Sequence, residues 1–113
     1  MKIIFSNKKL EKYAEDEKAA VRKLGSLRAD LYLQRLGDLA AAETLEDVRY
    51  LPGKYHELEH NRKGQWACSL DQPYRLIFEP IEKPIPTDPD GKAIWIKIKG
   101  VDIVEINDYH KER

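Results

Sequence analysis

Two arginines and a polar cluster near the end of the chain carry the side chains best suited to phosphate chemistry. Arg75 lies in the middle of an apolar run, and Arg62 precedes a second such run. A guanidinium group binds the paired oxygens of a phosphate or carboxylate. Asp108, Tyr109 and His110 follow one another and supply a carboxylate, a phenol and an imidazole. Because histidine alone among these types has an unperturbed pKa near neutrality, His110 is the candidate proton carrier.

A β-hairpin is predicted to position Arg75. Apolar residues alternate with other residues on both sides of the turn-forming sequence Asp71-Gln72-Pro73, a pattern typical of two strands with one apolar face. The apolar positions are Trp66, Cys68, Leu70, Tyr74, Leu76 and Phe78. Alternation turns Arg75 toward the opposite face. Most arginines on strands simply pair with an acidic side chain, but one flanked by apolar residues also suits anion binding.

The composition indicates one small domain, residues 1–113, in a reducing compartment. The 20 Lys and Arg residues balance 20 Asp and Glu residues, so a nucleic acid would have to meet a local basic patch. The single cysteine, Cys68, falls on a predicted strand and is expected to be a buried thiol. No apolar run is long enough for a signal peptide or a membrane span, so we expect a cytoplasmic protein without a membrane partner.

The first part of the chain is predicted to form one short strand followed by helices. A strand is predicted at residues 2–5, followed by a helix that is capped by Ser6 or Asn7 and runs to about Glu15. Asp16 then caps a second helix. The apolar stripe of that helix consists of Ala20, Leu24, Leu27 and Leu31, with Gly25-Ser26 either interrupting or weakening it.

The second half of the chain is predicted to be mostly strands. Their ranges are 54–60, 65–70, 74–79 and 94 to about 106, with an interruption or a bulge at Gly100. Residues 80–93 hold four of the six prolines and are expected to form an exposed loop. The predicted fold is therefore α+β, with N-terminal helices packed on one face of an antiparallel sheet of about four to five strands.

The segment His56-Glu57-Leu58-Glu59-His60 matches the H-E-x-x-H pattern of zinc proteases. Two histidines share one zinc ion when a helix places them one turn apart. Here the pattern follows Pro-Gly and leads into the predicted hairpin, so we expect an extended chain. At ~3.3 Å per residue the two imidazoles would then lie about 13 Å apart. One metal ion cannot bridge that distance, so neither a zinc site nor a cofactor is expected.

Three blocks, in order, resemble the HigB branch of the RelE/ParE toxin superfamily. The blocks are residues 61–66 (N-R-K-G-Q-W), residues 74–78 (Y-R-L-I-F) and residues 105–110 (E-I-N-D-Y-H). They are similar to a G-D-R-x-G-x-W hairpin entry, a W/Y-R-I/L-x-F strand and a terminal E-D-Y-H. With similar segments nearer the N-terminus, the resemblance spans nearly the whole chain outside residues 80–100.

The resemblance implies a small toxin of a type II toxin–antitoxin pair, held inactive by a HigA-like helix-turn-helix antitoxin. Relatives in this branch cut mRNA in the decoding site of the ribosome without a metal, and operator DNA would be met only through the antitoxin. The implied catalytic residues are Arg62, Arg75, Asp108, Tyr109 and His110. The implied RNA contacts are Lys63, Arg62, Arg75 and Tyr109.

The chemistry of these side chains is consistent with RNA cleavage. The 2′-hydroxyl must lose a proton and attack the adjacent phosphate, and the departing 5′-oxygen must gain one. Arg75, assisted by Arg62, would stabilise the charge that builds on the phosphate oxygens. Tyr109 would stack on a base or orient the attacking hydroxyl, and Asp108 would orient His110 or a base. The residues alone leave both pairs of roles open.

One departure from the family pattern bears on activity. Glu59 stands where the branch often has a lysine, so it would repel the scissile phosphate if it faced the site. Glu59 therefore raises the alternative of a weakly active member that serves as antitoxin partner and co-repressor. The resemblance to the superfamily leaves a second alternative, a toxin with a protein target such as DNA gyrase.

Overall fold

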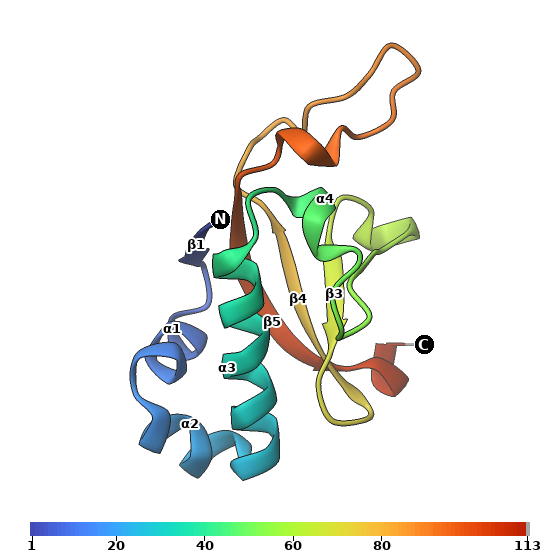
Figure 1. Cartoon of the computed structure of the whole chain (residues 1–113). Helices are drawn as coiled ribbons and strands as arrows, with labels where there is room; N and C mark the ends of the chain where they lie inside the picture. Colours follow the sequence, from blue (N-terminus) through green and yellow to red (C-terminus); the bar gives the residue numbers. More distant parts are fainter. Residues whose placement is uncertain (113) are drawn as a thin grey trace.

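Five strands form one mixed sheet in the computed structural model, which describes residues 1–112 (Figure 1). The strands are β1 (Lys2–Phe5), β2 (His56–Glu57), β3 (Trp66–Ser69), β4 (Tyr74–Pro80) and β5 (Gly100–Asp108), in the spatial order β1-β5-β4-β3-β2. Strands β2 to β5 pair antiparallel, as predicted. The prediction of a wholly antiparallel sheet is wrong at one edge, because β1 pairs parallel to β5.

Four α-helices and three short 3₁₀ helices complete the described part of the chain. They are α1 (Lys8–Glu15), α2 (Glu17–Leu24), α3 (Ser26–Ala41), α4 (Leu45–Val48), η1 (His60–Arg62), η2 (Trp95–Lys97) and η3 (Tyr109–Glu112). Of the two candidate caps of α1, Asn7 rather than Ser6 accepts hydrogen bonds from the first turn, and Asp16 caps α2 as the sequence predicts. None of the helices within residues 1–112 has the length and apolar character needed to cross a membrane.

Gly25 ends one helix and begins the next, which settles the alternative that the sequence left open. Its φ of 85° lies in the left-handed region, which a residue with a Cβ rarely adopts. The chain changes direction there, so the predicted continuous stripe is wrong at Leu27, which is 62% exposed. The buried positions of α3 are instead Ala29, Tyr32, Leu36 and Leu39.

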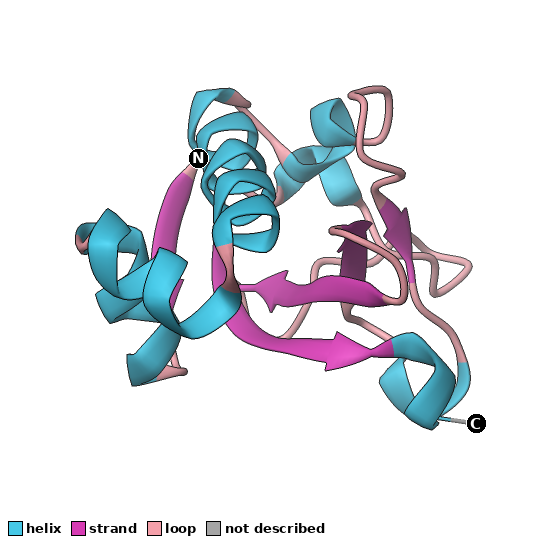
Figure 2. Ribbon diagram, turned by 90° about the horizontal axis from the view of Figure 1, so that it is seen from below, coloured by secondary structure: helices cyan, strands magenta, loops and turns pink. Residues whose placement is uncertain are grey.

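The main core lies between α3 and one face of the sheet, which confirms the predicted layers (Figure 2). Tyr32, Leu36 and Leu39 of α3 belong to the same buried cluster as the apolar face of the hairpin. That face consists of Trp66, Cys68, Leu70, Leu76 and Phe78, with Tyr74 packed at its margin. Cys68 is fully buried as predicted, and burial raises the pKa of its thiol to about 12.

Two of the predicted strands are shorter than their patterns suggest. The 54–60 run is extended only around His56–Glu57, because Lys54 and His60 adopt positive φ values of 55° and 57°. The 94–106 run becomes a strand only at Gly100, since residues 95–97 turn into η2. Gly100 starts β5 in close approach to the side chain of Ile81 rather than forming a bulge. The bulge lies farther along β5, opposite Ile77 and Phe78.

A charged pair ties the β3–β4 turn to α3. The Nε and Nη2 atoms of Arg28 donate to the two carboxylate oxygens of Asp71 at 2.9 and 3.0 Å. The guanidinium carbon of Arg28 also lies 3.6 Å from the centroid of the Tyr74 ring. The hydrogen bonds from Arg28 lower the pKa of the Asp71 carboxyl below its ordinary range.

Replacing Asp71 by asparagine is expected to lower the free energy of unfolding by about 1 kcal/mol at pH 7. Because the pKa of Asp71 is lowered in the folded state, its contribution is present above the ordinary aspartate pKa of about 4. The contribution is lost as the pH falls through the folded value. Urea unfolding at pH 7 and at pH 3 should therefore show a smaller difference in the free energy of unfolding between wild type and Asp71→Asn at pH 3. An equal difference at both pH values, or the same pH dependence in the exposed control Glu43→Gln, would contradict this role.

Candidate functional site

Arg75 points away from the core onto the second face of the sheet, as strand alternation predicts. Its neighbours in register are Ser69 on β3 and Asn107 on β5. The Nε atom of Arg75 donates to Oδ1 of Asn107 at 3.0 Å, which fixes the direction of the guanidinium group. We call this side of the sheet the open face. It carries Ser69, Arg75, Glu105 and Asn107, together with Ala67 and Ile77, which pack with Leu58 and are buried.

Arg62 reaches the same open face from η1. Its Nη2 atom donates to the carboxylate of Glu105, and its Nη1 atom donates to Oε1 of Gln65 at 2.8 Å. Glu105 and Asn107 are two residues apart on β5, so the partners of the two arginines are separated by about 7 Å along the strand. The structure therefore brings Arg62 and Arg75 together on one surface, with Arg62 held in an ion pair.

Tyr109 links Arg75 to η3. The guanidinium carbon of Arg75 lies 4.7 Å from the centroid of the Tyr109 ring, which is a cation–π contact. The backbone N–H of Tyr109 donates to the carbonyl oxygen of Pro73 at 3.0 Å. The β3–β4 turn therefore holds Tyr109 in place, while 49% of its surface stays open to solvent.

His110 lies beside the same tyrosine on the solvent-exposed helix η3. The centroids of the Tyr109 and His110 rings are 6.0 Å apart. The Oδ1 atom of Asp108 accepts a hydrogen bond from the backbone N–H of His110 at 2.9 Å, so Asp108 orients the backbone at this turn. Arg75 and His110 thus share one aromatic neighbour and lie on the same side of the molecule, as the sequence interpretation requires.

Two members of this surface were not predicted from the sequence. Asn107 holds Arg75, and Glu105 holds Arg62, although the sequence interpretation used neither side chain. A signal was present, because residues 105 and 107 have the two-residue period of a strand and flank the apolar Ile106. The sequence does not show that β5 pairs with β4, and it is this pairing that places Glu105 and Asn107 near the two arginines.

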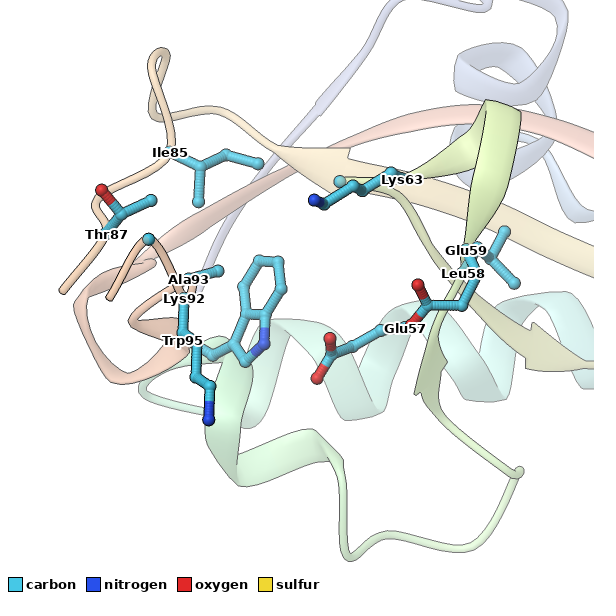
Figure 3. A pocket seen from close by; sticks show the side chains of 11 residues that line it. Glu57, Leu58, Glu59, Lys63, Ile85, Thr87, Lys92, Ala93 and Trp95 are labelled. Carbon is cyan, nitrogen blue, oxygen red and sulfur yellow. The ribbon is translucent and has the colours of Figure 1, made fainter. Parts of the chain in front are cut away.

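Lys63 lies in a pocket at the edge of the sheet, beyond Arg62. The pocket has a volume of about 570 Å³ and is bounded on one side by residues 57–59 and 63–64 and on the other by the loop before η2. In Figure 3 the side chain of Lys63 points into this space, across from Ile85 and Trp95. Of the predicted site residues, Lys63 is therefore associated with the pocket rather than with Tyr109.

The H-E-x-x-H segment has no helix to align its histidines. His56 belongs to β2 and His60 to η1, and the Nδ1 atom of His56 lies 2.7 Å from the carbonyl oxygen of Lys54. Across residues 1–111, no three His, Cys, Asp or Glu side chains are grouped closely enough to hold a metal ion.

Comparison with known proteins identifies the family. The model of the HigB-like toxins, described as RelE-like toxin of type II toxin-antitoxin system HigB, matches residues 3–87. The chain belongs to this family. Toxin HigB-1 of Vibrio cholerae serotype O1 is 35% identical over 80 residues, which are 70% of this chain and 83% of the relative. The YoeB/ParE toxin from Agrobacterium tumefaciens aligns over 96% of this chain and 99% of its own, with 12% identity and a TM-score of 0.48, a likeness too low to bear on function.

Membership in the HigB-like family confirms the resemblance based on the three blocks. It also means that a cognate antitoxin is a partner, since the family consists of toxins of type II toxin–antitoxin systems. The family match includes Arg62, Lys63 and Arg75 but ends before β5. Asp108, Tyr109 and His110 therefore enter the site through the geometry around Arg75 and not through the match.

Proposed function

We propose that this HigB-like toxin is an endoribonuclease that cleaves mRNA on the ribosome. The observation that carries the proposal is the cluster on the open face, where the Tyr109 ring contacts both the guanidinium group of Arg75 and the ring of His110. A fixed cation, an exposed phenol and an exposed imidazole are the groups that cleavage at a ribose 2′-hydroxyl requires. DNA lacks this hydroxyl and would not be a substrate.

In the proposed reaction the 2′-oxygen gives its proton to solvent water and bonds to the adjacent phosphorus. Negative charge builds on the non-bridging oxygens, where Arg75 stabilises it. The bond from phosphorus to the 5′-oxygen then breaks, and His110 delivers a proton to that oxygen. The products are a 2′,3′-cyclic phosphate and a 5′-hydroxyl end. Tyr109 stacks on a base beside the reacting linkage, and Asp108 holds the turn that carries His110.

Arg62 and Lys63 would extend the RNA contact along the sheet beyond Arg75. Because Arg62 is paired with Glu105, its role in the proposal is to assist Arg75 rather than to replace it. We propose one toxin domain over residues 1–113, acting in the cytoplasm where ribosomes translate mRNA. Its antitoxin would be a HigA-like helix-turn-helix protein, through which alone the toxin meets operator DNA.

Purified toxin, ribosomes and a short mRNA test this function directly. We expect cuts that map to the message only when ribosomes are present. A message with a single 2′-deoxynucleotide at the mapped site should lose that cut, because the attacking oxygen is gone, while cuts elsewhere persist. An intact message together with inhibition of DNA supercoiling by gyrase would overturn the proposal and favour a protein target.

A further inference from the structure

We propose that the pocket beside Lys63 binds a guanine base of the RNA, next to the linkage that is cut. This inference rests on the proposed function and names a base that the site prefers. The pocket volume of about 570 Å³ lies within the range of roughly 300–1,000 Å³ of small-ligand sites. Its walls combine an aromatic ring, two lysines (Lys63 and Lys92) and two glutamates (Figure 3).

Trp95 supplies a flat surface for stacking. Its ring packs edge-to-face against the fully buried Trp66, with centroids 5.4 Å apart and an interplanar angle of 87°. This contact fixes the orientation of the Trp95 indole, which borders the pocket. Bases stack on such aromatic surfaces in proteins that bind single-stranded RNA.

Glu59 and Lys63 supply the groups that distinguish one base from another. Glu57, the other acid, is already bound to Arg49 at 2.7 Å. The carboxylate of Glu59 has no hydrogen-bond or ion-pair partner among residues 1–111, and in Figure 3 it points into the pocket from the same side as Lys63. A carboxylate only accepts hydrogen bonds and an ammonium group only donates them. Guanine offers the matching edge, because the adjacent N1–H and N2 amino donors lie beside the O6 acceptor.

A cationic side chain of a partner protein fits this pocket less well. Such a guest would gain from Glu59 but would meet the ammonium group of Lys63, which points into the same space. A neutral base with both donors and acceptors can donate hydrogen bonds to Glu59 and accept one from Lys63. The observations therefore favour a nucleobase over a basic side chain.

The pocket borders the face of the sheet that carries Arg75. Leu58 lines the pocket and also packs on Ala67 and Ile77 of that face. Lys63 follows Arg62 in the chain, and Arg62 reaches Glu105 on the open face. An RNA strand held at Arg75 would pass Arg62 and deliver a neighbouring base to Trp95.

The inference assigns a purpose to the proline-rich loop and to Glu59. The loop is tied by hydrogen bonds from Asp88 N–H to the Lys92 carbonyl and from Ile94 N–H to the Pro86 carbonyl, both 2.8 Å long. These hydrogen bonds order the loop, which forms the wall of the pocket opposite Glu59. Glu59, at a position where the family often has lysine, lines this pocket. There its carboxylate accepts hydrogen bonds from the bound base.

Nucleoside binding tests the pocket without requiring cleavage. The chain has two tryptophans, and Trp66 is fully buried, so a fluorescence change on adding a nucleoside reports on Trp95. We expect guanosine to bind more tightly than inosine, which lacks the N2 amino group, by about tenfold, and uridine to bind most weakly. Glu59→Gln should remove the preference for guanosine over inosine, whereas the exposed control Glu17→Gln should keep it. Equal responses to the three nucleosides, or a response that persists in Trp95→Phe, would overturn the inference.

Mapping of cuts on ribosome-bound mRNA separates this inference from the proposed function. The wild type should cut sites that carry G at one fixed position relative to the cut, and Glu59→Gln should lose this preference. Cleavage with an unchanged site preference in Glu59→Gln would refute the guanine pocket but would still support the proposed nuclease function. If no cleavage occurs, the nucleoside titration still decides whether the pocket holds guanine. Weaker binding of the antitoxin to Glu59→Gln, without any guanosine binding, would assign the pocket to a protein side chain instead.

Discussion

Arg75→Ala is expected to slow cleavage of ribosome-bound mRNA by about 10²–10³-fold, the usual cost of removing one donor that stabilises charge in a transition state. The guanidinium group is held by a hydrogen bond to Asn107 and by its contact with the Tyr109 ring. It therefore needs no reorganisation as charge builds on the phosphate. Arg75→Lys keeps the charge but loses the paired geometry, so it should recover only part of the rate.

Single-turnover cleavage on preformed ribosome complexes measures this effect, because it excludes product release. Arg22→Ala is the matched control, since Arg22 is an exposed cation on α2, away from β4. Thermal unfolding should confirm that Arg75→Ala still folds, because Arg75 lies outside the buried core clusters. A rate within a factor of three of wild type in a folded Arg75→Ala protein would remove Arg75 from the mechanism.

The hairpin was predictable from the sequence because its information is local. Strand alternation over β3 and β4, with turn residues between them, specifies both which side chains enter the core and that Arg75 does not. The two helix caps, Asn7 and Asp16, were predictable for the same reason, since each bonds to a backbone group within three residues. Short-range patterns therefore placed the central cation of the site.

Contacts between distant segments were beyond such patterns. The parallel pairing of β1 with β5 joins residues nearly a full chain length apart, and no turn specifies it. The run after Ile94 has the composition of a strand but becomes η2, where Trp95 packs on the buried Trp66. Tertiary packing overrides local propensity in that segment. The pocket joins the residues on either side of η1 to the loop before η2, so short-range patterns could not predict it either.

The difference of Glu59 from the family's lysine is interpreted differently once the position of its side chain is known. As a replacement for a family lysine it suggested repulsion of the scissile phosphate, and so a weakened enzyme. In the structure it lines the pocket at the sheet edge, whereas the Arg75–Tyr109 contact lies on the open face. This position supports the proposed selectivity among bases.

His110→Gln is expected to reduce the cleavage rate by about 10²–10⁴-fold, the range typical of a lost proton-transfer group. Glutamine retains a polar side chain of similar reach but carries no titratable proton. Because Asp108 bonds to the backbone N–H of residue 110, the turn should survive the substitution. The same single-turnover assay measures the loss.

A sulfur substitution in the RNA distinguishes a proton donor from a residue that only positions the substrate. When the 5′-bridging oxygen at the cut site is replaced by sulfur, the leaving thiolate is stable without protonation. His110→Gln should then cleave at nearly the wild-type rate. Arg75→Ala should stay slow on the same message, because charge still builds on the non-bridging oxygens that Arg75 stabilises. If His110→Gln remains equally impaired with sulfur, His110 does not protonate the leaving group, and the imidazole acts only through its contact with Tyr109.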